Sequence, residues 1–362
     1  MNYQAFQALI KQGKIASCYL LEGEEEYIKQ QMLALLAGKI LTPGMEAMNR
    51  TDLTNPPADA IISAAETLPF MSERRLVVVR ECPYLALSKK GGGEETAEAE
   101  EDEKGGKTKK ATKDPDLDSL LNYLPTLPAE TCLIFYQKGK ADSRKKLYTT
   151  LKKMNAIVTI ERMTDADCAG WLVKKLKKLG KTMDYATANH MVFTVGTDAA
   201  LLNQEIEKLA ASVADREIIT KEDIEAICTH SVESNVFNMI DAQVAGHTGK
   251  ALALLRDMQQ LGESPFMVLS LLLRQYRILY HLRRLESEGV EQNKLAELTG
   301  IAPYFLTRSR QQANAFSLEK LREAYDYLVE NEFLLKQGRL PQQGCAENAM
   351  LRLEEILRGQ EA

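Results

Sequence analysis

Short, unbroken runs of apolar residues alternate with longer helix-like stretches over the first part of the chain. Four of these runs have the length of strands and lie at 18–21, 76–79, 132–136 and 157–160. Strands of a parallel sheet are covered on both faces by helices, so they occur as nearly continuous apolar runs and not as alternating ones. The pattern predicts an α/β domain with a parallel sheet over residues 1–163.

Helical periodicity replaces the strand-like runs after this point. Thr164 is followed by an acidic residue, Asp167, at the spacing that opens a helix, and Gly180 is expected to end that helix. Thr220 opens another short helix in the same way. These features predict a small helical domain over residues 164–231.

The remaining sequence keeps its helical pattern to the end. Residues 268–285 carry so many apolar side chains beside their arginines that this stretch should form a central, largely buried helix. We therefore expect an all-helical third domain over residues 232–362.

Residues 88–116 interrupt the α/β pattern. They contain three consecutive glycines, an acidic block over 94–103 and a lysine-rich block over 104–113. The segment has almost no apolar surface to offset the entropy lost on ordering, which is typical of a disordered loop. A charged tail that contacts a partner is the alternative.

The composition is that of a globular protein without a strong electrostatic bias. Of 362 residues, 45% are hydrophobic and 27% are charged, and the formal net charge is -5. This charge argues against a protein that mainly coats nucleic acid, so any DNA contact should be local or shared. No apolar run approaches the length of a membrane span and the amino terminus lacks the blocks of a signal peptide, which favours a cytoplasmic protein without membrane contact.

Neither the cysteines nor the histidines follow a metal-binding pattern. The six cysteines are scattered and none forms a C-x-x-C pair, which indicates small buried side chains. The four histidines are dispersed as well, without the spacing of a zinc site. We expect no metal, no cofactor and no catalytic residue.

The loop after the first strand, where α/β proteins hold nucleotides, fails the phosphate-binding test. A P-loop needs the pattern G-x-x-x-x-G-K-[ST], whose small residues let backbone N–H groups wrap the phosphates. Here Gly23 is followed by Glu24, Glu25 and Glu26, whose charges suit a helix N-terminus but would repel a triphosphate. The sequence therefore predicts no nucleotide hydrolysis.

An apolar cluster, Leu68, Pro69, Phe70 and Met71, lies shortly before the run at 76–79. Pro69 disfavours helix in the residue before it, so the cluster should lie on a connection. Connections ordinarily run over the surface and are polar, so apolar side chains here either fold back onto the core or await a partner. The residues alone leave both interpretations open.

A basic cluster follows the run at 132–136. Its members are Lys138, Lys140, Arg144, Lys145 and Lys146. Such a cluster could contact a DNA backbone or a partner protein, but the apolar spacing around Leu147 and Leu151 also fits an amphipathic helix with a solvated cationic face. Both interpretations stay open at this stage.

Three segments, 19–25, 68–78 and 142–147, resemble the delta subunit of bacterial DNA polymerase III, a part of the clamp loader. The resemblance extends over essentially the whole chain, and segment 68–78 is its most specific part. It implies an AAA+-like nucleotide-fold domain without ATPase activity, a helical lid domain and a helical collar domain that joins the subunits. In this family the matching apolar residues insert into a hydrophobic pocket of the ring-shaped sliding clamp, which would make residues 68–71 a clamp-binding wedge.

The resemblance also implies a set of partners. They are the sliding clamp, the ATPase subunits and a delta-prime-like subunit of a hetero-pentamer, and primed DNA within that complex. The chain would then be a subunit of a DNA-directed DNA polymerase, a nucleotidyltransferase, with no catalytic site of its own. The alternatives are an active AAA+ ATPase and a DNA-binding protein that acts alone.

Overall fold

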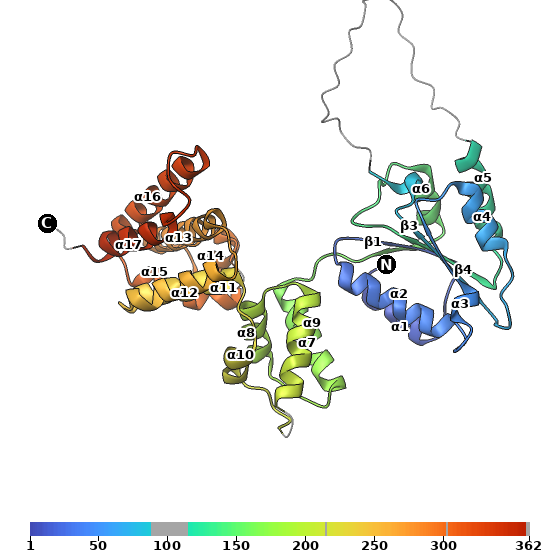
Figure 1. Cartoon of the computed structure of the whole chain (residues 1–362), viewed down its shortest axis with the longest axis horizontal. Coiled ribbons are helices and arrows are strands. Elements are labelled where there is room, and N and C mark those ends of the chain that lie inside the picture. The colour runs from blue at the N-terminus through green and yellow to red at the C-terminus, as the bar shows by residue number, and fades with distance from the viewer. Residues whose placement is uncertain (88–114, 214–215, 302, 360–362) are drawn as a thin grey trace, which may run out of the picture. The chain divides into compact units, whose positions relative to one another are not determined.

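The structure of the chain is a computed structural model, which describes residues 1–87, 115–213, 216–301 and 303–359 (Figure 1). Its contacts divide the chain into two compact units, Met1–Arg162 and Met163–Ala362. The first unit ends next to the predicted end of the α/β domain. The predicted lid and collar domains both fall within the second unit, and their separation after residue 231 stays a prediction.

A five-stranded parallel sheet forms the centre of the first unit. Its strands are β1 (Cys18–Glu22), β2 (Arg50–Thr54), β3 (Arg75–Arg80), β4 (Thr131–Tyr136) and β5 (Ile157–Thr159). They lie in the order β2-β3-β4-β1-β5, and every neighbouring pair is parallel. The four strands predicted from apolar runs are confirmed, and so is the α/β class of this unit.

The strand β2 was missed by the sequence analysis, because it has no apolar run. It lies at an edge of the sheet, and its side chains alternate between exposed and half-buried. Leu53 is its one apolar side chain and packs against the core. A search for continuous apolar runs does not detect such an edge strand.

Helices cover both faces of the sheet. They are α1 (Tyr3–Lys11), α2 (Glu26–Ile40), α3 (Glu46–Asn49), α4 (Ala58–Glu66), α5 (Pro115–Tyr123) and α6 (Lys146–Lys153), with the short 3-10 helices η1 (Pro83–Leu85) and η2 (Leu124–Thr126). Figure 1 shows α1 and α2 on one face and α4, α5 and α6 on the other. On the second face, Ile61, Leu120 and Leu151 share a core with Val77 and Phe135 of the strands.

The predicted loop 88–116 lies outside the described residues, apart from its last two positions. Pro115 and Asp116 are already helical and open α5, so the predicted loop extends too far at this end. Proline fits the first position of a helix and acidic side chains suit its first turn, which explains why the helix begins here.

Helices also form the second unit. They are α7 (Asp165–Lys178), α8 (Tyr185–Val195), α9 (Ala199–Ser212), α10 (Lys221–Ile227), α11 (Val232–Val244), α12 (Thr248–Gln260), α13 (Pro265–Ser287), α14 (Gln292–Thr299), α15 (Pro303–Asn314), α16 (Leu318–Lys336) and α17 (Cys345–Arg358). Thr164 opens α7 and Thr220 opens α10, each hydrogen-bonded to the aspartate three residues later, as predicted. Gly180, with a φ of 74°, comes just after the end of α7.

The central helix of the second unit is α13, which includes the predicted residues 268–285, but it is not largely buried, because only six of its 23 residues are buried. Its buried side chains include Leu272, Tyr276 and Leu279, which share a core with α11, α15, α16 and α17. The hydroxyl of the fully buried Tyr276 donates to Gln243 Oε1 over 2.9 Å, so this polar atom has a partner. Among the described helices, none is long and apolar enough to cross a membrane.

Candidate functional site

The connection between α4 and β3 presents three large apolar side chains to solvent. Leu68 is 77% exposed, Phe70 55% and Met71 75%, whereas Pro69 between them is half-buried. Of the two interpretations of this cluster, the structure therefore excludes the one in which these side chains fold back onto the core. We call residues 67–72 the wedge loop.

Buried polar side chains hold the wedge loop in place. Arg75, the first residue of β3, is 5% exposed and donates to the Thr67 carbonyl over 3.0 Å and to Thr51 Oγ1 over 2.8 Å. Burial lowers the pKa of Arg75. Asn49, the last residue of α3, is fully buried and binds the backbone of Phe70. The sequence analysis missed both roles, because the contacts depend on how α3, β2 and the wedge loop come together in the fold.

The wedge loop and the candidate nucleotide loop lie at opposite ends of the parallel strands. The wedge loop precedes β3, whereas the loop from Gly23 follows β1, and all strands are parallel. Open α/β sheets bind ligands at the carboxyl ends of their strands. The loop after β1 is therefore where a nucleotide would be expected.

Backbone N–H groups of the loop after β1 are already hydrogen-bonded within the protein. The N–H of Gly23 donates to the Gly139 carbonyl over 2.8 Å, and the N–H of Glu25 donates to the Ile160 carbonyl over 3.3 Å. Gly23 has a φ of 115°, and a Cβ added to it would lie 2.1 Å from the Ile160 carbonyl oxygen. This glycine allows two backbones to approach closely, and the two N–H groups are not available to a phosphate.

Lys29 stands at the lysine position of the P-loop pattern counted from Gly23, with Ile28 where the second glycine would be. Its side chain is fully buried. The ammonium donates to the Gln137 carbonyl over 2.9 Å and pairs with Glu26 over 2.9 Å. The lysine is thus directed to partners inside the protein.

Tyr136, at the end of β4, completes this cluster. Its hydroxyl donates to the carboxylate of Glu26 in a short hydrogen bond, and the ammonium of Lys29 lies 5.3 Å from the centroid of its ring. Burial, followed by the interaction with Glu26, raises the pKa of Tyr136. Burial alone would raise the pKa of Glu26, but the hydrogen bonds from Tyr136 and Lys29 outweigh it and lower that pKa. The arrangement stabilises a carboxylate and an ammonium next to each other.

The predicted basic cluster lies on and before α6. This helix buries Leu147 and Leu151, so the amphipathic pattern is confirmed. Three of the five basic side chains form ion pairs, which are Arg144 with Asp142 at 2.8 Å, Lys140 with Glu161 at 3.0 Å and Lys146 with Asp118 at 3.4 Å. Lys138 is exposed and Lys145 half-buried, and neither is ion-paired to a residue that the structure describes.

The hydrogen bonds from Arg144 hold the pKa of Asp142 well below its usual range. The Asp142 side chain is only 4% exposed, whereas that of Arg144 is 76% exposed. The negative charge of Asp142 therefore weakens the attraction between Arg144 and a phosphate backbone.

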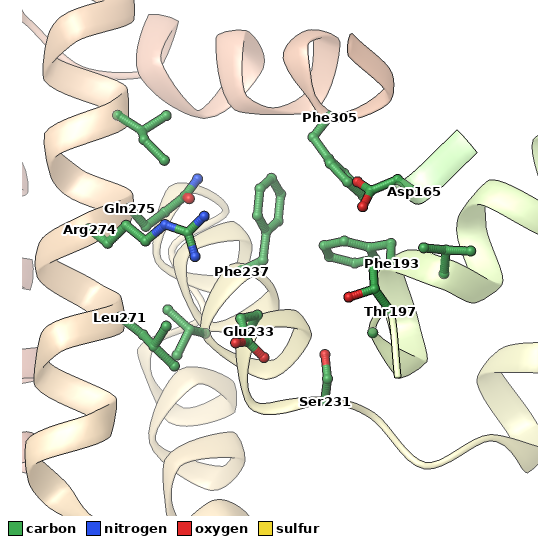
Figure 2. Close-up of a pocket in the computed structure, with 14 residues that line it drawn as sticks. Asp165, Phe193, Thr197, Ser231, Glu233, Phe237, Leu271, Arg274, Gln275 and Phe305 are labelled. Atoms are coloured by element: carbon green, nitrogen blue, oxygen red, sulfur yellow. The ribbon is translucent and has the colours of Figure 1, made fainter. Parts of the chain in front are cut away.

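A cavity of about 340 Å³ lies in the second unit (Figure 2). Figure 2 shows the rings of Phe193, Phe237 and Phe305 on one side of it and Arg274 with Gln275 of α13 on the other. Its lining includes none of the residues predicted for a site. Within the described parts of the chain, no group of His, Cys, Asp and Glu side chains could hold a metal ion.

Two family models match the chain. The model of the DNA polymerase III delta subunit matches residues 19–101 and 104–161. The model of the C-terminal domain of the DNA polymerase III delta subunit matches residues 233–353. The first match includes the wedge loop and the loop after β1, and the second includes most of the helices of the second unit.

Known proteins resemble the chain over most of its length. DNA polymerase III subunit delta of Bacillus subtilis is 27% identical over 347 residues, which are 95% of this chain and 94% of that protein. The probable DNA polymerase III subunit delta of Aquifex aeolicus is 24% identical over 197 residues, which are 54% of this chain and 56% of that protein. The solved structure of the Bacillus subtilis DNA clamp loader delta protein has a TM-score of 0.57 at 25% identity, and the match covers 98% of this chain and 99% of that one. The chain belongs to the family of DNA polymerase III delta subunits, which are subunits of the clamp loader.

Proposed function

We propose that this chain binds the sliding clamp through the wedge loop and helps to open the ring for loading onto primed DNA. The observation that carries the proposal is the exposure of Leu68, Phe70 and Met71 on a loop whose backbone is held by buried polar side chains. Apolar side chains that the fold holds in water are favourable to bury, and a hydrophobic pocket on a partner provides that burial.

The size of these side chains fits a binding hot spot. Burying Phe70 with one aliphatic neighbour supplies roughly 3–5 kcal/mol of gross apolar transfer free energy. Aromatic side chains that enter a desolvated pocket commonly dominate the energy of an interface. A loop of this kind can therefore carry much of a clamp interface with few residues.

Opening of the clamp follows if the wedge loop binds the open ring better than the closed one. A ligand shifts a two-state equilibrium only by its difference in affinity for the two states. Inserting apolar side chains near a ring interface would favour the strained or open form. We infer that the ATPase subunits of the complex control when the wedge loop is accessible, so the assembled loader should bind the clamp differently with and without ATP.

The chain itself is proposed to hydrolyse no ATP. Support comes from the loop after β1, where backbone N–H groups, the glycine and the lysine of a P-loop pattern are all engaged in contacts within the protein. An active AAA+ ATPase is the alternative. Saturable binding of labelled ATP to the isolated chain, with turnover, would support that alternative.

The remaining partners follow from the family. We propose a hetero-pentamer with ATPase subunits and a delta-prime-like subunit, joined through helices of the second unit, with primed DNA held by the complex. Lys138 and Lys145, which form no ion pair with a described residue, are the first candidates for a DNA or partner contact. A protein that binds DNA on its own is disfavoured, because carboxylates neutralise the other three members of the cluster.

Equilibrium binding of the full chain to the sliding clamp of the same organism tests the proposal. Phe70→Ala should weaken binding by about 2–4 kcal/mol, roughly thirtyfold to a thousandfold, without disturbing the core. Phe333→Ala in α16 is the matched control, because Phe333 is 56% exposed and Phe70 is 55% exposed. Equal binding of wild type and Phe70→Ala would refute the wedge, and a loss in Phe333→Ala alone would move the contact to the second unit.

A further inference from the structure

The backbone of Phe70 is bound by a side chain from another part of the fold. Asn49 Oδ1 accepts a hydrogen bond from the N–H of Phe70 over 2.7 Å, and Asn49 Nδ2 donates to the carbonyl of Phe70 over 2.9 Å. The same amide nitrogen lies 2.9 Å from Ser72 Oγ and 3.1 Å from the Met45 carbonyl. The Phe70 N–H can be met only by the amide oxygen, so the orientation of the Asn49 amide follows from its partners.

Asn49 is fully buried, whereas the side chain that it supports points into solvent. Both the N–H and the carbonyl of Phe70 are therefore hydrogen-bonded to a buried side chain, whereas its ring lies outside the core. Ser72 adds a second connection, because its hydroxyl donates to Thr42 Oγ1 over 3.0 Å. Met71 lies between these two tethered residues and has a φ of 48°, a left-handed conformation that a β-carbon disfavours. The hydrogen bonds of Asn49 and Ser72 therefore hold the backbone on both sides of a disfavoured conformation.

A buried asparagine that binds a loop backbone is often only structural. Here, however, the bound backbone belongs to the aromatic residue of the wedge loop, so the hydrogen bonds determine how that ring is presented. We propose that Asn49 is a positioning residue, which pre-forms the wedge loop for the clamp and so reduces the conformational entropy lost on binding. This inference rests on the proposed function of the wedge loop.

The expected effect follows from the entropy of one or two backbone positions. If the Phe70 backbone is no longer held by Asn49 in the free chain, it must be ordered on binding, which should weaken clamp binding roughly fivefold to thirtyfold. Asn49→Ala in the full chain removes all the hydrogen bonds of this side chain but leaves Leu68, Phe70 and Met71 in place. Asn331→Ala is the matched control, because its amide also donates to the carbonyl four residues earlier, over 2.9 Å, in α16.

Hydrogen exchange provides the readout that separates positioning from general stability. In Asn49→Ala, amides of the wedge loop should exchange faster, whereas amides of β3 should keep the wild-type rate. On a Phe70→Ala background, Asn49→Ala should weaken clamp binding by less than about twofold, since there is no ring left to position. Asn49→Leu keeps the branched shape of the side chain but has neither acceptor nor donor, and it replaces Asn49→Ala if that variant does not fold.

Four results would overturn the inference. Faster exchange in the wedge loop with unchanged clamp affinity would mean that Phe70 needs no positioning. Equal losses from Asn49→Ala with and without Phe70 would indicate a general structural role. If Phe70→Ala itself binds as tightly as wild type, the wedge proposal fails first and this inference fails with it, whereas a loss in Phe70→Ala beside wild-type affinity in Asn49→Ala removes only the positioning role.

Discussion

The role of Lys29 is determined by its surroundings. In a P-loop the lysine reaches the phosphates of the nucleotide. Here its ammonium is fully buried between the Gln137 carbonyl and Glu26, beside the ring of Tyr136. A buried charge is tolerated only with its complete set of partners, so this lysine is tied to the fold and not to a ligand.

Replacing Lys29 should therefore affect folding and not nucleotide binding. We expect Lys29→Ala to lower the free energy of unfolding of the first unit by on the order of 3 kcal/mol, because it leaves a cavity and an unpaired carbonyl. Hydrogen exchange of β1 amides measures this loss, and Lys39→Ala at an exposed position of α2 is the control, with a change within about 0.5 kcal/mol. A P-loop lysine would behave in the opposite way, since the wild type would bind ATP and the variant would fold normally but bind none.

A second residue-scale prediction concerns Gly23. Gly23→Ala should cost on the order of 2–4 kcal/mol, because the new Cβ would lie 2.1 Å from the Ile160 carbonyl oxygen at a φ of 115°. Gly38→Ala is the matched control, because Gly38 is exposed in α2 with nothing near its Cβ, and it should stabilise by about 0.5–1 kcal/mol. Unfolding of the first unit in urea distinguishes the two, and similar effects of both variants would contradict the close approach at Gly23.

At this scale the sequence predicted the apolar members of the wedge loop but not their support. Leu68, Phe70 and Met71 could be singled out because apolar side chains on a connection are unusual. Their exposure could not be derived, since it depends on how α4 and β3 meet. Asn49 and Arg75 act through hydrogen bonds to the backbone of the wedge loop, and no spacing in the sequence indicates such contacts.

At the scale of elements, the strands with an unbroken apolar run were predictable, including β5 at one edge of the sheet, whereas the polar edge strand β2 was not. Burial on both faces requires an apolar side chain at nearly every position, as in β3 and β4, whose side chains are almost all buried. The edge strand β2 needs only Leu53 for the core and carries polar residues elsewhere. Helix openings at Thr164 and Thr220 were predictable, because capping is a local interaction between residues close in sequence.

The helix α6 allows a prediction about DNA. Because three basic side chains near it are paired with carboxylates, the isolated chain should bind DNA no better than non-specifically, with a Kd on the order of 10⁻⁴ to 10⁻⁶ M. Fluorescence anisotropy with a primed duplex, at two salt concentrations, measures this affinity. Tight binding that falls steeply with salt and is lost in Lys145→Glu would instead support a DNA-binding protein that acts without partner subunits.

At the scale of the whole molecule, the first unit separates the proposed clamp contact from the loop after β1, where α/β proteins bind nucleotides. The wedge loop lies at the amino ends of the strands and the loop after β1 at their carboxyl ends, so the proposed clamp contact and the loop after β1 do not overlap. The α/β class and the helical remainder followed from hydrophobic patterning. The assignment to clamp loaders came from segment-level resemblance, because hydrophobic patterning alone is shared by unrelated families.

Release of the sliding clamp from circular DNA tests the central claim most directly. A closed ring on a closed circle can leave only if one of its interfaces opens, so the rate of release reports opening itself and not merely binding. We predict that the full chain accelerates release, that Phe70→Ala reduces this acceleration at least about tenfold, and that Phe333→Ala does not change it. Wild-type chain that leaves the rate of release unchanged, or Phe70→Ala that accelerates it as well as the wild type does, would contradict the account.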